Sequence, residues 1–179
     1  MFDRLIDLLV DFVQIFQFWV VIDEYERGVV LTLGKRRYRF LFWKRNPVLQ
    51  PGFHWVIPFD VDQIFVDNVV PAAMDLGEQS LTTEDGVEIV IQGMVLWSIN
   101  DIEKTVLKVE EVDDVLHQAS CGIIGDTVAD STWKHIHANG FADEISETIT
   151  KEADGWGVTV HEFRFIDLSK APSLRLWNE

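Results

Sequence analysis

Residues 86–99, GVEIVIQGMVLWSI, restrict the fold of this chain more than any other stretch. Their apolar side chains recur with a period of two, at Val87, Ile89, Ile91, Val95, Trp97 and Ile99. Because neighbouring side chains of a strand point to opposite faces, this pattern predicts a strand with one buried face. The length of the run, between TTEDG and NDIE, predicts a central strand of a mainly antiparallel sheet.

Three further segments have the composition of strands. Residues 26–34 (ERGVVLTLG) are rich in β-branched side chains and end at Gly34, and residues 61–70 (VDQIFVDNVV) form a second such run. In residues 158–168 the apolar side chains change phase between Val160 and Phe163, which predicts a β-bulge.

Helical periodicity occupies residues 101–130 and returns in FADEISETITKEADGWG, where glycines can end the helix. Asn100 together with Glu103 is expected to cap the first helix. A chain of 179 residues with 47% hydrophobic content can bury one sizeable core. We therefore expect one α+β domain over residues 23–172, with a mainly antiparallel sheet and packed helices.

Residues 1–22 (MFDRLIDLLVDFVQIFQFWVVI) are mostly apolar, and their polar side chains recur at three- and four-residue steps. This spacing predicts an apolar amino-terminal helix with one narrow polar face. Asp7 and Asp11 leave too short an uncharged run to span a bilayer, so a helix in the membrane plane is expected. Packing on the protein's own core is the alternative. The expected membrane-anchoring residues are Phe2, Leu5, Leu8, Leu9, Phe12, Phe16 and Trp19.

Residues 35–45 (KRRYRFLFWKR) hold six of the fifteen basic side chains, with aromatic residues between them. This mixture is typical of lipid headgroup regions. A hairpin with inward-packed aromatics is the alternative, and single-stranded nucleic acid is disfavoured by the net charge of −15. The expected headgroup contacts are Lys35, Arg36, Arg37, Arg39, Lys44 and Arg45.

No pattern of catalytic residues is present in the sequence. His117 and Cys121 are four residues apart, but neither they nor the His135-x-His137 pair has the carboxylate partner of a common zinc motif. No nucleophile elbow, phosphate loop or dinucleotide fingerprint occurs. We expect no enzyme, no metal and no cofactor.

The order of four segments resembles a known family. They are VIDEYERGVVLTLGKRR, LQPGFHWVIPFDVDQIFVDNVV, LTTEDGVEIVIQGMVLWSI, and helices closing on ADGWGVTVHEFRFIDL. Together they are similar to the SPFH, or band-seven, domain of stomatin, prohibitin, flotillin and HflK/HflC, over residues 20–172. In that family the Pro51-Gly52 turn connects strands of a scaffold. Pro51 presets φ, Gly52 tolerates the reversal and Pro58 ends a strand, which leaves the aromatic run as core or membrane-facing rim.

The resemblance implies a non-enzymatic scaffold that attaches to one membrane leaflet, on the cytoplasmic side. It also implies homo-oligomers, contact with membrane lipid, and regulation of partners such as a membrane protease or a channel. Nucleic acid is not an expected partner. The alternative is a soluble interaction module whose apolar amino-terminal helix packs on another chain.

Family members continue beyond the last strand into a long helical segment, whereas the sequence here ends in APSLRLWNE. Residues 173–179 are expected to form a short tail that contributes oligomer contacts. Those contacts are expected from Leu174, Leu176 and Trp177, which are unusually apolar for a chain end. We expect a weaker oligomer than in longer relatives.

Overall fold

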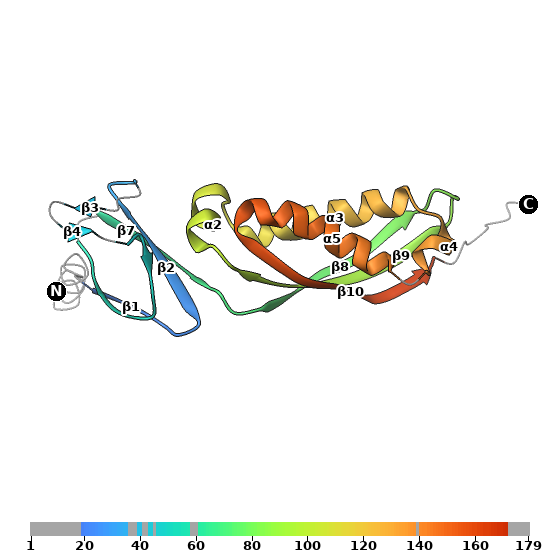
Figure 1. The fold of residues 1–179 in the computed structure, drawn as a ribbon. Coiled ribbons are helices and arrows are strands. Elements are labelled where there is room, and N and C mark those ends of the chain that lie inside the picture. The colour runs from blue at the N-terminus through green and yellow to red at the C-terminus, as the bar shows by residue number, and fades with distance from the viewer. Residues whose placement is uncertain are drawn as a thin grey trace, which may run out of the picture. The chain divides into compact units, whose positions relative to one another are not determined.

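The computed structural model describes residues 19–35, 39–40, 43–44, 46–57, 61–138 and 140–171, with backbone only at 39–40 and 43–44. The chain divides into two compact units (Figure 1). Unit 1 comprises the described residues up to Val70 together with Ile102–Val106, and unit 2 comprises Pro71–Asp101 together with those from Leu107 onward. The expected α+β class with antiparallel sheets is confirmed for the described residues.

Unit 1 consists of short antiparallel strands and the first part of helix α2 (Ile102–Lys108). Strands β5, β2 and β7 form one sheet, β1 pairs with β6 in a two-stranded ribbon, and β3 pairs with β4. The bounds are β1 Trp19–Ile22, β2 Glu26–Thr32, β3 Arg39–Phe40, β4 Trp43–Lys44, β5 Val48–Leu49, β6 Gly52–Trp55 and β7 Asp62–Asn68. Ile22, Val30 and Leu49 form its buried cluster, with Val20 and Ile64 packed against it.

The expected helix over residues 1–22 is wrong at its carboxyl end, because Trp19–Ile22 form strand β1. Each of these residues pairs with one in Gly52–Trp55, in antiparallel register. The β-branched side chains of Val20, Val21 and Ile22 favour a strand once such a partner exists. Residues 1–18 lie outside the described part of the chain.

The Pro51-Gly52 turn connects β5 to β6, as the sequence predicts. Gly52 has a φ of 128°, a conformation that residues with a side chain rarely adopt. The residue expected to end the following strand, Pro58, lies outside the described residues.

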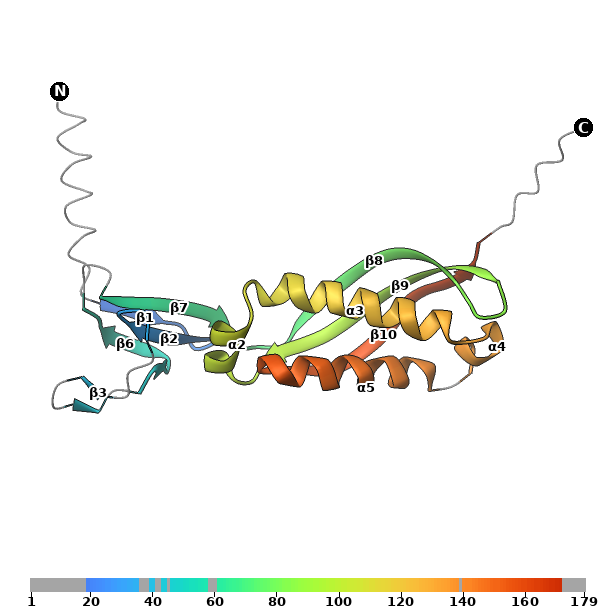
Figure 2. The same cartoon turned by 90° about the horizontal axis from the view of Figure 1, so that it is seen from above.

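Unit 2 is an antiparallel sheet of three long strands in the order β10-β9-β8, with helices along one face (Figure 2). Its elements are β8 Ala72–Thr82, β9 Glu88–Ile99, α3 Val112–Ala129, α4 Trp133–Ile136, α5 Phe141–Ala153, the 3₁₀ turn η1 Asp154–Trp156 and β10 Val158–Lys170. Helix α3 packs on β8 and helix α5 on β10. Gly157 directly follows η1, and its positive φ of 82° lets the chain turn into β10.

Strand β9 is the central strand that the two-residue period predicts. Ile89, Ile91, Val95, Trp97 and Ile99 are buried, whereas the alternate residues are half-buried or exposed. The predicted bulge is also confirmed, because the register of β10 against β9 shifts between Val160 and Glu162. The extra residue is His161, whose Nε2 lies 2.9 Å from the hydroxyl of Ser98.

The TTEDG segment forms a turn that holds the sheet to the helical layer. The hydroxyl of Thr83 donates to the Asp85 carboxylate and accepts the backbone N–H of Val87 at 3.1 Å. Asp85 also accepts the backbone N–H of Trp133, the first residue of α4, at 3.1 Å. These bonds give the segment a structural role.

Asn100 does not cap the first helix in the expected way, because α2 begins at Ile102 and Asp101 precedes it. Its side-chain amide instead donates to the hydroxyl of Thr159 at 2.7 Å, and its backbone N–H donates to the carbonyl of Gly157 at 3.0 Å. Asn100 therefore joins the end of β9 to the start of β10.

Candidate membrane-contact site

One face of the β1–β6 ribbon presents four large apolar side chains to solvent. The register pairs Trp19 with Trp55 and Val21 with Phe53, so all four point to the same side. They are 48 to 69% exposed, with Trp55 the most exposed. The rings of Phe53 and Trp55 meet edge to face, with centroids 5.3 Å apart. We call Trp19, Val21, Phe53 and Trp55 the tryptophan face.

The opposite side of the ribbon explains why the tryptophan face stays exposed. Ile22 is 2% exposed and belongs to the buried cluster of unit 1, against which Val20 also packs. His54, on this side too, donates from Nε2 to the carbonyl of Gln50 at 2.6 Å. Because alternate residues already face the core, the pleat forces the remaining apolar residues outward.

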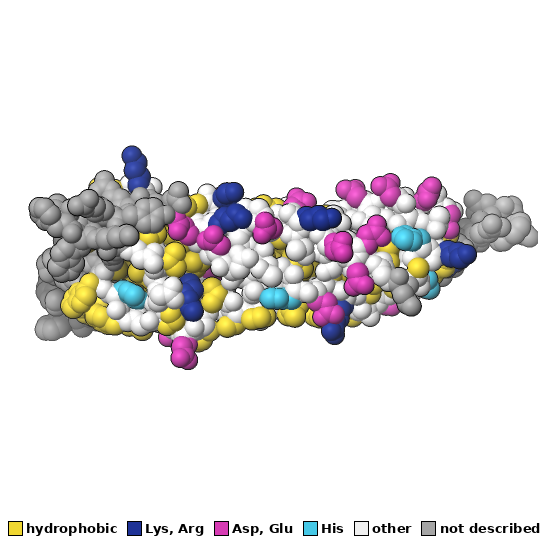
Figure 3. All heavy atoms as spheres, in the orientation of Figure 1, with side chains coloured by type: hydrophobic (Ala, Val, Ile, Leu, Met, Phe, Trp, Pro, Cys, Tyr) yellow, Lys and Arg dark blue, Asp and Glu magenta, His cyan; other side chains and the backbone are white. Residues whose placement is uncertain are grey.

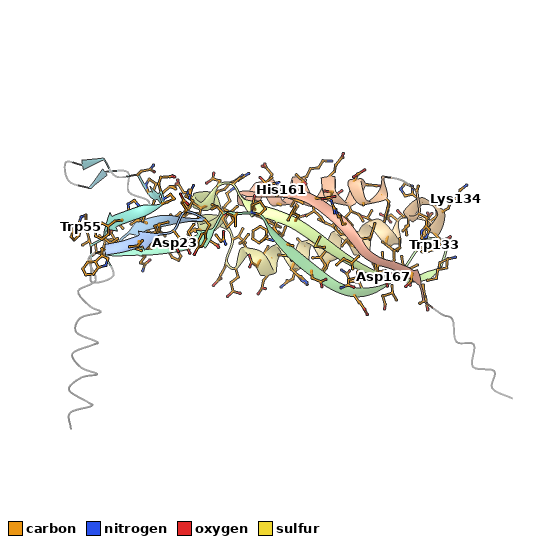
Figure 4. The ribbon with its side chains drawn as sticks, turned by 90° about the horizontal axis from the view of Figure 1, so that it is seen from below. Asp23, Trp55, Trp133, Lys134, His161 and Asp167 are labelled. Carbon is orange, nitrogen blue, oxygen red and sulfur yellow. The ribbon has the colours of Figure 1, made fainter. Side chains whose placement is uncertain are left out.

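Asp62 ties the chain that follows β6 to the end of β2. One carboxylate oxygen accepts the backbone N–H of Ile57 at 2.9 Å, and the other accepts the hydroxyl of Thr32 at 2.7 Å. Trp55 lies two residues before Ile57, at the opposite end of the unit from Asp23 (Figure 4). Asp62 therefore links the chain that leaves Trp55 to Thr32, the residue directly before the turn that follows β2.

That turn consists of Leu33 and Gly34, which we call the β2 turn. Thr32 and Lys35 exchange backbone hydrogen bonds of 3.0 and 3.2 Å across it. Both turn residues have positive φ, 52° for Leu33 and 69° for Gly34. Positive φ at both positions is the pattern of the two-residue turns that join antiparallel strands. The sequence predicts a strand that ends at Gly34, whereas β2 ends at Thr32 and Gly34 belongs to the turn that follows.

The basic segment follows the β2 turn directly. Lys35 is exposed, and strands β3 and β4 pair Arg39 with Lys44 in a short hairpin. Arg36, Arg37, Arg45 and the side chains of Arg39 and Lys44 lie outside the described residues. Whether these cations meet headgroups or solvent therefore stays a prediction.

The remaining expected contact residues are not described by the structure. They are Phe2, Leu5, Leu8, Leu9, Phe12 and Phe16 of the predicted anchor and Leu174, Leu176 and Trp177 of the tail. Among the residues that are described, no helix is long and apolar enough to cross a bilayer.

Acidic side chains are concentrated in the second part of the chain. Residues 71–179 contain 21 of the 30 acidic and 7 of the 15 basic side chains, so they carry −14 of the net charge of −15. Figure 3 shows carboxylates spread over the helical side of unit 2, and hydrophobic side chains gathered at the β1 end of unit 1. An anionic surface would repel unit 2 far more than unit 1.

The sequence offers His117, Cys121, His135 and His137 as candidates for a metal site. Nδ1 of His117 lies 3.9 Å from Sγ of Cys121, and burial raises the pKa of that thiol. His135 contacts Glu144 at 3.2 Å, whereas the ring of His137 lies against that of Trp133, with centroids 4.0 Å apart and planes tilted by 44°. No group of three metal-binding side chains exists in the part of the chain that the structure describes.

Sequence reasoning found only Trp19 of the tryptophan face. The sequence leaves the aromatic run with Phe53 and Trp55 as either core or membrane-facing rim. The sequence predicts a helix at Val21 and a strand at Leu33. The run of β-branched residues after Trp19 was the one available signal for a strand there.

The amino-acid sequence is similar to a family of known proteins. The profile described as SPFH domain / Band 7 family matches residues 20–175. The chain is 26% identical over 148 residues to an uncharacterized protein of Methanocaldococcus jannaschii, covering 80% of this chain and 68% of that protein.

Two relatives with names are similar at the same level. Protein HflK of Vibrio parahaemolyticus is 26% identical over 158 residues, covering 86% of this chain and 37% of that protein. Stomatin of Mus musculus is 21% identical over 150 residues, covering 83% of this chain and 50% of that protein. The chain thus spans half or less of both named relatives.

Proposed function

Because the chain belongs to the SPFH domain / Band 7 family, whose members are typically membrane-associated scaffolds, we propose that it is a non-enzymatic scaffold bound to one membrane leaflet. The tryptophan face is the observation that carries this proposal. Tryptophan and tyrosine concentrate at membrane interfaces, where an apolar ring can leave water while its N–H or O–H stays near the headgroups. Four exposed apolar side chains on a rigid ribbon suit that environment.

The distribution of charge supports membrane contact through unit 1. The first 70 residues hold nine acidic and eight basic side chains, so they are nearly neutral, and six of those basic side chains lie in residues 35–45. The cytoplasmic leaflet is the more anionic one and attracts such basic segments. We therefore propose that unit 1 meets the cytoplasmic leaflet and that the acidic unit 2 faces water.

Assembly and partners are further parts of the proposal. Residues 1–18 would add membrane anchoring through Phe2, Leu5, Leu8, Leu9, Phe12 and Phe16, and the chain would form homo-oligomers. Through them it would organise the local membrane or regulate a membrane protein, such as a protease or a channel. The resemblance to HflK and stomatin supports this class of partner.

Co-sedimentation with vesicles of phosphatidylcholine and phosphatidylserine tests the membrane proposal. The full chain should sediment with vesicles, and replacing Phe53 and Trp55 with Ser should weaken binding by roughly tenfold or more. Both side chains are more than half exposed, so the fold should survive the change. Ile166→Ser removes a similarly exposed side chain, 53%, from unit 2 and should bind like the parent.

The same experiment distinguishes the membrane scaffold from the alternative, a soluble module that packs on another protein chain. A full chain that stays in the supernatant at every lipid concentration contradicts the membrane proposal and favours a module that packs on another protein chain. Replacing Phe12 and Phe16 with Ser measures the contribution of the predicted anchor separately from that of the tryptophan face.

A further inference from the structure

The backbone conformation at Leu33 of the β2 turn is one that disfavours leucine. Leu33 has a φ of 52°, in the left-handed region, where an L-residue with a branched side chain is strained. Glycine, asparagine and aspartate are the residues usually found at this position of a two-residue turn. Leu33 therefore costs the fold free energy that Asn would not.

Packing does not explain why a leucine occupies this position. Its side chain is 59% exposed, so it contributes little to the buried core. The backbone holds the turn in place here, because the N–H of Leu33 donates to the carbonyl of Val61 at 2.7 Å. Any other residue except proline would keep that hydrogen bond. An exposed apolar residue held in a strained conformation is an observation that points to function.

We propose that Leu33 is a membrane-insertion point, which enters the lipid interface beside the tryptophan face. This inference rests on the proposed membrane function and adds a second contact to it, formed by a different strand. Asp62 links the two contacts, because it accepts hydrogen bonds from Ile57, two residues after Trp55, and from Thr32, directly before Leu33. A tight turn with a rigid backbone can present one side chain to lipid without exposing unpaired backbone groups.

The positive charge next to Leu33 favours a lipid surface as the binding partner of this side chain. Lys35 is exposed directly after the turn and begins the segment with six basic side chains. An apolar tip that cations follow directly in the sequence, on a unit that also exposes Trp19 and Trp55, matches the layered chemistry of a bilayer surface, with its apolar interior, interfacial belt and anionic headgroups. A second copy of the chain would instead bring its own basic segment against this one.

Leu33→Asn provides a variant that separates membrane contact from folding. Asn tolerates positive φ, so the thermal midpoint should be equal to or above that of the parent. Partition of the full-length variant into phosphatidylcholine–phosphatidylserine vesicles should be about three- to tenfold weaker, because the apolar side chain is lost. Leu33→Met keeps an apolar tip and should bind like the parent. Ile166→Asn is the matched control on unit 2.

Depth measurement tests the same inference directly. A polarity-sensitive fluorophore on Leu33→Cys, in a Cys121→Ala background, should shift to the blue with vesicles and be quenched by spin-labelled lipid. The same fluorophore on Ile166→Cys should not respond. If the chain sediments with vesicles while the probe at 33 stays in water, the membrane function stands and the insertion point is wrong.

The other outcomes also decide the question. A chain that does not sediment at all overturns both the proposed function and this inference. A Leu33→Asn variant that binds vesicles like the parent but has a lower mass by light scattering would identify a second copy as the occupant, and would overturn the insertion point alone.

Discussion

The ring of Phe163 packs directly on Gly93: a Cβ added to Gly93 would lie 2.6 Å from Cε2 and 2.9 Å from Cζ of that ring. Gly93 sits on the central strand of unit 2, and the registers of both neighbouring strands shift beside it. One shift lies between Asp75 and Glu78 of β8, and the other between Phe165 and Asp167 of β10. The sheet therefore bends where the missing side chain leaves room for a buried ring.

Gly93→Ala should destabilise unit 2. The new methyl group must displace Phe163, which is 3% exposed, and overpacking of this kind costs about 1–3 kcal/mol. Denaturant unfolding followed by circular dichroism measures the change. Gly122→Ala is the matched control, since nothing lies within 4 Å of its added Cβ in helix α3. That variant should gain about 0.5–1 kcal/mol instead, and equal stability of the two variants would contradict the packing explanation.

The Asp85 turn should make stability depend on pH in the acidic range. The hydrogen bond from Thr83, with that from the Trp133 backbone, lowers the pKa of Asp85 below its ordinary value of 3.8. A carboxyl group whose pKa is lower in the folded state stabilises the fold above its unfolded pKa. This contribution is lost as the pH falls through the folded pKa.

Asp85→Asn should therefore have a lower thermal midpoint than the parent at neutral pH, and the difference should shrink as the pH falls below about 4. Thermal scans over a series of acidic buffers measure it. Glu84→Gln, at the neighbouring exposed position, controls for the loss of one negative charge. A gap between parent and Asp85→Asn that stays constant down to low pH would contradict the assignment.

The basic segment should contribute electrostatic binding to anionic vesicles. Lys35, Arg36, Arg37, Arg39, Lys44 and Arg45 are each expected to supply up to about 1 kcal/mol near the membrane surface. Replacing Arg36, Arg37 and Arg39 with Gln should weaken binding at low salt, and less at high salt because ions screen the interaction. Vesicles of phosphatidylcholine alone should show no difference. Binding indifferent to both salt and these changes would favour the hairpin with inward-packed aromatics.

The tail should support self-association. Leu174, Leu176 and Trp177 make residues 173–179 apolar for a segment exposed to water. Deleting 173–179 should lower the mass measured by light scattering in detergent. An unchanged oligomer removes any role for the tail, and a monomeric parent contradicts the prediction of a homo-oligomer altogether.

The sequence alone predicted the elements whose signals are local. The two-residue period of β9, the phase change at His161 and the glycines after α5 each depend on neighbours along the chain, and the structure confirms all three. Helix and strand periods reflect which residues of one element face the core, so a single segment carries enough information to predict them. Two of the four segments that carry the family resemblance contain these features.

Only the tertiary structure decided the conformation of Trp19–Ile22 and the exposure of their side chains. Read alone, Trp19–Ile22 continue an apolar helical pattern, but pairing with Gly52–Trp55 turns them into a strand and sends Trp19, Val21, Phe53 and Trp55 to one exposed face. The strain at Leu33 likewise arises because Thr32 and Lys35 close a two-residue turn around it. In both cases hydrogen bonds to a partner strand, and not the local preference of the residues, determine which side chains meet water.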